Sequence, residues 1–159
     1  MIEQASRDVA NLLFFRLFQT MNILHRQAQH DLGISTVQWA VLGALSRPGY
    51  EQGVSFNELT EYLVVSRQSL DGVLKRMERD NHVMRIPHPA DGRARLVQIT
   101  EQGKAFWSSL QPGISQFYQE ALSGFSLDEA VSMVHGLNKL QADIPKAGQR
   151  QEQPEAESV

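Results

Sequence analysis

The chain has 159 residues, 42% of them hydrophobic, and a formal net charge of −3. This length suits a single domain or a domain with a dimerisation element, and the hydrophobic content excludes an intrinsically disordered chain. The lack of cysteine excludes disulfides and thiol-based sensing, and no apolar run reaches the length of a membrane span, so we expect a cytoplasmic protein.

Apolar residues dominate the first predicted helix, which covers about residues 5–32. Val9, Leu13 and Leu17 follow helical spacing, whereas Phe14 and Phe15 place aromatic rings on another side. A helix that is apolar on most sides needs cover on more than one of them. A second copy of the chain is the natural cover.

Serine followed three residues later by glutamine or glutamate marks the start of three further helices. These pairs are Ser35 with Gln38, Ser55 with Glu58 and Ser126 with Glu129. The resulting helices begin at residues 35, 56 and 127, and a loop at 47–53 separates the first two.

Two more helices are predicted from single capping residues. Ser66 caps a helix that extends to about Asp80, and Asn81 suits the left-handed backbone that follows a helix end. Another helix starts at Thr100, and the Pro-Gly pair at 112–113 is expected to kink or break it. Residues 145–159 are polar and are expected to form a solvated tail.

A β-hairpin is predicted between the helices that start at 66 and 100. Two β-prone runs, 83–86 and 94–99, flank a proline-rich loop that carries Asp-Gly at 91–92, a strong hairpin pattern. Arg93 and Arg95 lie at the tip or just after it, where no core can use them. A helix pair with a tight turn followed by a basic hairpin is a winged helix, in which the helix enters the DNA major groove and the wing the minor groove.

Positive charge is concentrated in residues 66–99, which hold seven Arg or Lys and four acidic residues. This segment therefore carries +3 and the remainder of the chain −6. A local positive field can capture a phosphate backbone although the net charge is negative. The alternative is an ordinary solvated helix face.

In this order and spacing the motifs resemble the MarR family of bacterial transcription regulators, from about Val9 to Leu140. The resemblance rests on Asp-x-Arg at 91–93, on the strand-to-helix junction Leu-Val-Gln-Ile-Thr-Glu-Gln-Gly at 96–103, and on Gln-Trp-Ala-Val-Leu at 38–42. It implies a homodimer built from the first, fifth and sixth helices and a roughly palindromic operator. It also implies a small-molecule cleft between the dimerisation helices and the DNA-binding lobe.

The predicted fold is therefore mainly α, a winged helix-turn-helix with N- and C-terminal dimerisation helices, comprising six helices and a two-stranded β-wing. Residues 1–34 and 100–144 would supply the dimerisation helices, 35–99 the DNA-binding lobe and 145–159 the polar C-terminal tail.

Nine residues are candidates for DNA contact: Ser66, Arg67, Gln68, Ser69, Lys75, Arg76, Asp91, Arg93 and Arg95. The first four open the recognition helix, where arginine suits guanine and glutamine suits adenine, although Ser66 is expected to cap the helix as well. Lys75 and Arg76 lie further along and suit phosphate. Asp91 can orient the Arg93 guanidinium, which by the resemblance enters the minor groove; a solvated arginine is the alternative.

Arg16 is the candidate for ligand binding, because a helical wheel places it among Leu13, Thr20 and Ile23 inside the apolar stripe. A buried guanidinium needs a counter-charge, either from a protein carboxylate or from an anionic ligand. Family members respond to small aromatic carboxylates or phenols, so the resemblance favours a carboxylate clamp at Arg16. Thr20 and Trp39 would then line the cleft, and a purely core role is the alternative for Trp39.

The expected function is a ligand-responsive homodimeric repressor, released from its DNA operator by a small aromatic acid, a phenol or a thioester of such an acid. The alternative is an architectural or protein-interaction winged helix without an effector. We expect no catalytic residue, metal site or cofactor, since the chain lacks a phosphate-binding loop and a nucleophile elbow, and its histidines lack ligand spacing.

Overall fold

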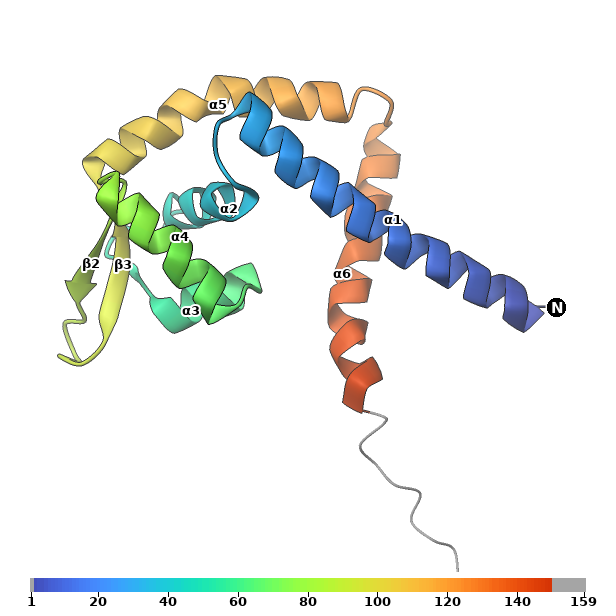
Figure 1. The fold of residues 1–159 in the computed structure, drawn as a ribbon, viewed down its shortest axis with the longest axis horizontal. Helices are drawn as coiled ribbons and strands as arrows, with labels where there is room; N and C mark the ends of the chain where they lie inside the picture. The colour runs from blue at the N-terminus through green and yellow to red at the C-terminus, as the bar shows by residue number, and fades with distance from the viewer. Residues whose placement is uncertain (1, 150–159) are drawn as a thin grey trace, which may run out of the picture. The chain divides into compact units, whose positions relative to one another are not determined.

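The computed structural model describes residues 2–149, and in that range the fold is mainly helical, as predicted. Its six helices and three strands are α1 (Ile2–Asp31), α2 (Thr36–Leu45), β1 (Val54–Ser55), α3 (Phe56–Leu63), α4 (Arg67–Arg79), β2 (Val83–Pro87), β3 (Arg95–Ile99), α5 (Glu101–Ala121) and α6 (Leu127–Gln149). The chain divides after Ile114 into two compact units. The first contains the helix-turn-helix and its wing (Figure 1), and the second contains the end of α5 and α6.

The core of the first unit lies between α2, α3, α4 and the sheet. Leu70, Leu74 and Met77 follow helical spacing on α4 and are completely buried. They pack in one cluster with Leu42 of α2 and Leu59 of α3. Burial of this face of α4 fixes the orientation of the helix, because its opposite face must then point to solvent.

The wing is an antiparallel hairpin of β2 and β3, with Val83 opposite Ile99 and Pro87 opposite Arg95. The predicted hairpin is thus confirmed. A third strand, β1, pairs with the other edge of β3, which gives the sheet order β1-β3-β2. The sequence did not predict β1, because a strand of two residues carries no periodic pattern.

The predicted serine caps are confirmed at three helix starts. Ser55 and Glu58 form a complete capping box: Ser55 Oγ accepts the N–H of Glu58 at 3.2 Å, and the carboxylate accepts the N–H of Ser55 at 3.0 Å. Hydrogen bonds from the side chain and then the backbone of Ser55 hold the pKa of Glu58 below its ordinary value. Ser126 and Glu129 bond reciprocally in the same way, and Ser35 caps α2. Local chemistry therefore sets where these helices begin.

Two helices continue through prolines where the sequence predicts an interruption or an end. Helix α5 is unbroken at Pro112, and α6 continues through Pro145 to Gln149. A proline removes one backbone hydrogen bond, and the remaining bonds of a 21-residue or 23-residue helix keep it continuous. The predicted tail is consequently helical as far as Gln149, and residues 150–159 lie outside the described residues.

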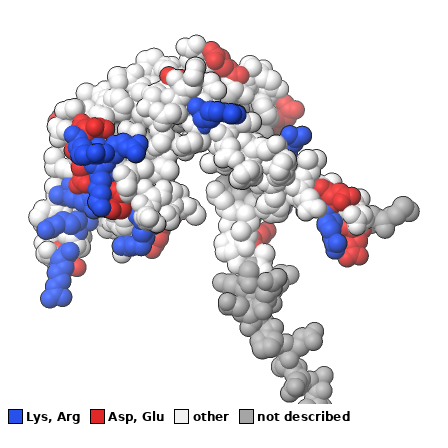
Figure 2. All heavy atoms as spheres, in the orientation of Figure 1, with Lys and Arg blue, Asp and Glu red and all other residues white. Residues whose placement is uncertain are grey.

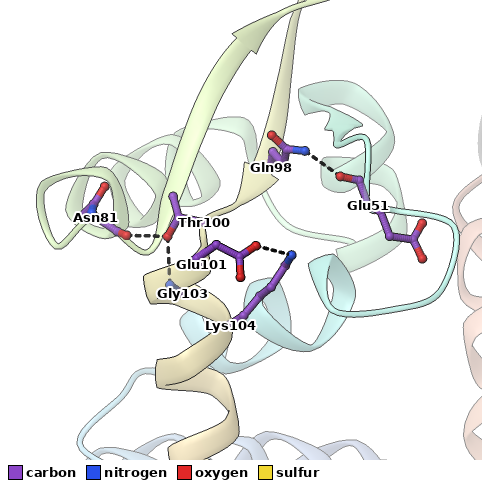
Figure 3. Close-up of polar contacts among 7 residues, drawn as sticks. All are labelled: Glu51, Asn81, Gln98, Thr100, Glu101, Gly103 and Lys104. Atoms are coloured by element: carbon purple, nitrogen blue, oxygen red, sulfur yellow. Dashed lines mark hydrogen bonds and ion pairs between the residues drawn. The ribbon is translucent and has the colours of Figure 1, made fainter.

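The junction between β3 and α5 is held by backbone contacts to the turn after α4 (Figure 3). Thr100 is buried; its Oγ1 donates to the carbonyl oxygen of Asn81 at 2.6 Å and accepts the N–H of Gly103 at 2.9 Å. The Thr100 N–H donates to the carbonyl oxygen of His82 at 3.0 Å. A Cβ at Gly103 would lie 2.0 Å from that same oxygen, so only glycine allows this approach.

We expect Gly103→Ala to lower the free energy of unfolding by roughly 2–4 kcal/mol, because the added methyl group collides with a backbone carbonyl that cannot rotate away. Urea denaturation measures the loss. Gly72→Ala on α4 is the control, since no atom lies within 4 Å of the Cβ it would add. This control should be neutral or stabilising by up to about 1 kcal/mol, and equal losses in the two variants would contradict the assigned role.

Candidate nucleic-acid interface

The first turn of α4 presents the predicted recognition residues to solvent. Ser66, Arg67, Gln68 and Ser69 are all exposed. Ser66 Oγ accepts the N–H of Ser69 at 3.1 Å, so this hydroxyl caps the helix as predicted. Helix α4 packs beside β2, and Figure 1 shows the wing extending next to it. An exposed helix N-terminus beside a β-wing suits the major and minor grooves of one DNA duplex.

The Arg67 side chain is held against α3 and does not extend freely into solvent. Its Nη1 donates to Asn57 Oδ1 at 2.5 Å, and its Cζ lies 4.9 Å from the centre of the Phe56 ring. A cation over an aromatic face is attracted to it, and the hydrogen bond fixes the plane of the guanidinium. Both partners are neutral, so the full positive charge of Arg67 stays at this surface. No local pattern in the sequence predicts Phe56 and Asn57 as its partners.

Asp71, on the face of α4 toward the wing, pairs with two cations at once. Its Oδ2 lies 2.8 Å from Lys75 Nζ, and its Oδ1 lies 2.8 Å from Arg85 Nη2. The hydrogen bonds from Lys75 and then from Arg85 hold the pKa of the Asp71 carboxyl below its ordinary value. Lys75 and Arg76 are both exposed, as phosphate contacts require, but Lys75 already has a carboxylate partner one turn earlier.

Arg85 joins the wing to the recognition helix. It projects from β2 with a side chain that is 29% exposed, and besides Asp71 its Nε lies 3.3 Å from Glu78 Oε1. A guanidinium between two carboxylates of one helix fixes the strand against that helix. In the sequence, Arg85 contributes only to the positive charge counted for residues 66–99. Fourteen residues separate it from Asp71, so no spacing rule pairs them.

The wing tip differs in detail from the expectation. Asp91 was expected to orient the Arg93 guanidinium, but its Oδ1 accepts the backbone N–H of Arg93 at 3.0 Å. The short aspartate side chain reaches the main chain two residues on, as in an Asx turn, and so it shapes the loop. Arg93 and Arg95 are both exposed. Gly92 lacks the positive φ that a two-residue Asp-Gly turn requires, and the loop is longer than that turn.

Basic side chains gather over α4 and the wing, with acidic side chains among them (Figure 2). This distribution agrees with the excess of seven basic over four acidic residues at 66–99. Four of these charges, on Lys75, Asp71, Arg85 and Glu78, form one connected group of ion pairs. The positive field of the surface therefore depends most on the exposed arginines of α4 and the wing tip.

The predicted ligand residues lie on α1 and α2. Arg16 and Thr20 are exposed, and Trp39 is half-buried. Arg16 Nη1 donates to Gln19 Oε1 at 3.1 Å, and within residues 2–149 no ion pair of Arg16 is found. The expected burial of Arg16 is therefore not present in the single chain, because the apolar stripe around it is itself exposed. The nearby apolar residues Leu12, Leu13, Phe14, Phe15 and Phe18 of α1 are 43–65% exposed.

Across the described residues no group of three or more His, Cys, Asp or Glu side chains is placed to hold a metal ion. The helices of the same part of the chain are too short or too polar to span a bilayer.

Known proteins resemble this chain in sequence. The profile of the family described as the MarR family matches residues 32–94. The transcriptional activatory protein BadR of Rhodopseudomonas palustris is 46% identical over 140 residues, which cover 86% of this chain and 80% of that protein. The homoprotocatechuate degradative operon repressor of Escherichia coli is 29% identical over 115 residues, which cover 68% of this chain and 76% of that protein.

Solved structures resemble it in fold. A mutant MarR of Escherichia coli complexed with operator DNA has a TM-score of 0.69 and 26% identity, with 82% of this chain and 91% of that chain covered. BpsR of Bordetella bronchiseptica, whose DNA binding is regulated by 6-hydroxynicotinic acid, has a TM-score of 0.69 and 25% identity, with 83% and 98% covered.

We expect Arg85→Met to lower the free energy of unfolding by about 1 kcal/mol, because two carboxylates of α4 lose their shared, partly exposed cation while the aliphatic stem is kept. Arg79→Met is the matched control, because it removes an exposed arginine from the last turn of α4. Thermal denaturation compares the two. If both variants lose the same stability, Arg85 is only one more surface charge.

Proposed function

This chain belongs to the MarR family of transcriptional regulators, and we propose that it is a homodimeric repressor released from a pseudo-palindromic operator by a small aromatic acid. The observation that carries the proposal is the exposed first turn of α4 beside an exposed basic wing tip. A MarR protein with a similar fold has been solved in complex with operator DNA, which supports double-stranded DNA as the partner. Catalysis is no part of the proposal, because the family consists of transcriptional regulators.

DNA contact is assigned to two elements. In α4, Arg67 and Gln68 would meet base edges, Ser66 and Ser69 the nearby backbone, and Lys75 and Arg76 phosphates further along. In the wing, Arg93 and Arg95 would approach the minor groove, with Asp91 shaping the loop that carries them. The ion pairs of Arg85 support simultaneous contact, because they hold the wing to the helix.

Dimerisation is supported by the exposed apolar surface of α1. Eight large apolar residues of this helix are 43–67% exposed: Val9, Leu12, Leu13, Phe14, Phe15, Phe18, Met21 and Ile23. The second unit, taken by itself, exposes Leu127, Val131 and Val134 of α6 in the same way. Monomeric proteins rarely leave continuous apolar surfaces of this kind in water, so a second copy is the proposed cover.

The effector class is supported by Arg16 and by the relatives. A guanidinium within an apolar stripe that a second copy would cover requires an anion, and an aromatic carboxylate supplies both an anion and an apolar ring. The relatives include a regulator of homoprotocatechuate degradation and a protein regulated by 6-hydroxynicotinic acid. Thr20 and Trp39 are the proposed companions of Arg16, and a thioester of the acid would use the same contacts.

Release would follow from a shift between two arrangements of the dimer. Two recognition helices bind successive major grooves only when they lie about 34 Å apart. An effector that binds the other arrangement more tightly lowers the population that matches DNA, and an effector that binds both equally changes nothing.

Activation is a second candidate, favoured by the 46% identity with a transcriptional activatory protein. Transcription in vitro from the promoter upstream of the protein's own gene, with and without benzoate- and cinnamate-type acids, separates repression from activation. Repression relieved by an acid supports the proposal, whereas transcription that requires the protein supports activation. Specific DNA binding that no acid alters would favour the architectural alternative without an effector.

We expect Arg93→Ala to weaken operator binding about tenfold without changing thermal stability, because the exposed wing-tip cation contacts DNA and nothing in the core. Fluorescence anisotropy on labelled upstream DNA measures the affinity. Arg79→Ala removes the same charge from the far end of α4 and should change the affinity little. Unchanged binding by Arg93→Ala would remove the wing from the interface.

We expect Arg16→Ala to weaken effector binding about tenfold or more, because a charge-assisted hydrogen bond to the carboxylate is lost. Isothermal titration calorimetry with the acid that releases DNA measures the affinity, and Arg7→Ala, an exposed arginine of the same helix, is the control. Identical affinity in Arg16→Ala and the parent protein would assign Arg16 a structural role.

A further inference from the structure

The wing loop between β2 and β3 is ordered by its own hydrogen bonds. The His88 N–H donates to the carbonyl oxygen of Ala94 at 3.1 Å, and the Ala94 N–H donates to that of Asp91 at 3.0 Å. The Asp91 carboxylate accepts the Arg93 N–H at 3.0 Å. Since Gly92 has no positive φ and a Cβ there would meet nothing within 4 Å, glycine does not dictate the shape of this loop.

The His88 imidazole supplies the remaining bonds. Its Nδ1 lies 3.1 Å from the backbone nitrogen of Ala90 and 3.2 Å from that of Asp91. Pro89 intervenes and has no N–H, so these are the first two backbone donors that follow His88. A nitrogen that accepts two N–H groups carries no proton, and the ring proton must therefore be on Nε2.

We propose that His88 is a positioning residue for operator binding, which orders the wing loop so that Arg93 is presented to DNA in a fixed place. The proposal rests on the proposed role of Arg93 in the wing. Ala90 and Asp91 are exposed residues at which water competes for the backbone N–H groups, so the gain from His88 is loop order. A loop ordered before binding does not have to lose that freedom on the DNA.

Two substitutions separate the acceptor from the bulk of the side chain. His88→Leu keeps a side chain of similar reach but removes the Nδ1 atom that accepts the two N–H groups. His88→Asn supplies a carbonyl oxygen that accepts N–H groups two and three residues on, as asparagine does in turns. Each is combined with Arg93→Ala, which gives a double-mutant cycle on operator affinity, and thermal denaturation confirms that every variant is folded.

We expect His88→Leu to weaken operator binding by about threefold to tenfold, and His88→Asn to remain within about twofold of the parent protein. In the Arg93→Ala background the additional loss from His88→Leu should be less than about twofold, since there is no longer a wing arginine to position. A merely structural role would not give rescue by asparagine together with this dependence on Arg93.

Other outcomes overturn the proposal in distinguishable ways. Equal losses in both backgrounds without rescue by asparagine would mean that His88 contacts DNA itself. No loss in His88→Leu, while Arg93→Ala still weakens binding, would leave the wing assignment intact and remove His88. No effect of Arg93→Ala would refute the wing assignment, on which the proposal depends.

A measurement on the unsubstituted protein without DNA tests the contact directly. Two-bond ¹H–¹⁵N correlation spectra of the imidazole identify which ring nitrogen carries the proton. A neutral His88 with its proton on Nε2 supports the proposal, and a proton on Nδ1 overturns it.

Discussion

The backbone approach between Gly103 and the carbonyl oxygen of His82 is the constraint on which the winged helix-turn-helix depends. That oxygen also accepts the N–H of Thr100, so one peptide group fastens the turn after α4 to the end of β3 and the start of α5. Thr100 adds a hydrogen bond to Asn81 from the same place. The turn after α4, the end of β3 and the start of α5 thus meet at one set of backbone contacts.

Local patterns predicted the parts of this structure that local chemistry decides. Ser55 with Glu58, and Ser66, mark helix starts because their side chains bond backbone groups three residues away. The β2–β3 hairpin followed from two β-prone runs. The pairs that orient the interface, Arg67 with Asn57 and Arg85 with Asp71, join residues 10 and 14 apart through tertiary packing, and no sequence period encodes them. The two-residue strand β1 was not predicted for a related reason, since it is a strand only because β3 pairs with it.

Arg16 shows a different limit of what a sequence pattern can predict. A helical wheel correctly places it in an apolar stripe, yet burial of that stripe depends on what covers it, and in the single chain its apolar neighbours are exposed. A sequence pattern reports which face of a helix avoids water but not whether the cover comes from the same chain. Whether Arg16 has a counter-charge therefore depends on what covers this stripe.

The shared carboxylate of Asp71 has a consequence for how binding responds to ionic strength. A cation releases a bound counterion from DNA only when it neutralises a phosphate, and the steepness of the fall in affinity with salt counts such events. The carboxylates of Asp71 and Glu78 balance the charges of Lys75 and Arg85, whereas Arg67 is held by neutral partners and keeps its charge. At the proposed interface, the salt dependence of DNA binding would accordingly be shallower than the count of seven basic residues in 66–99 suggests.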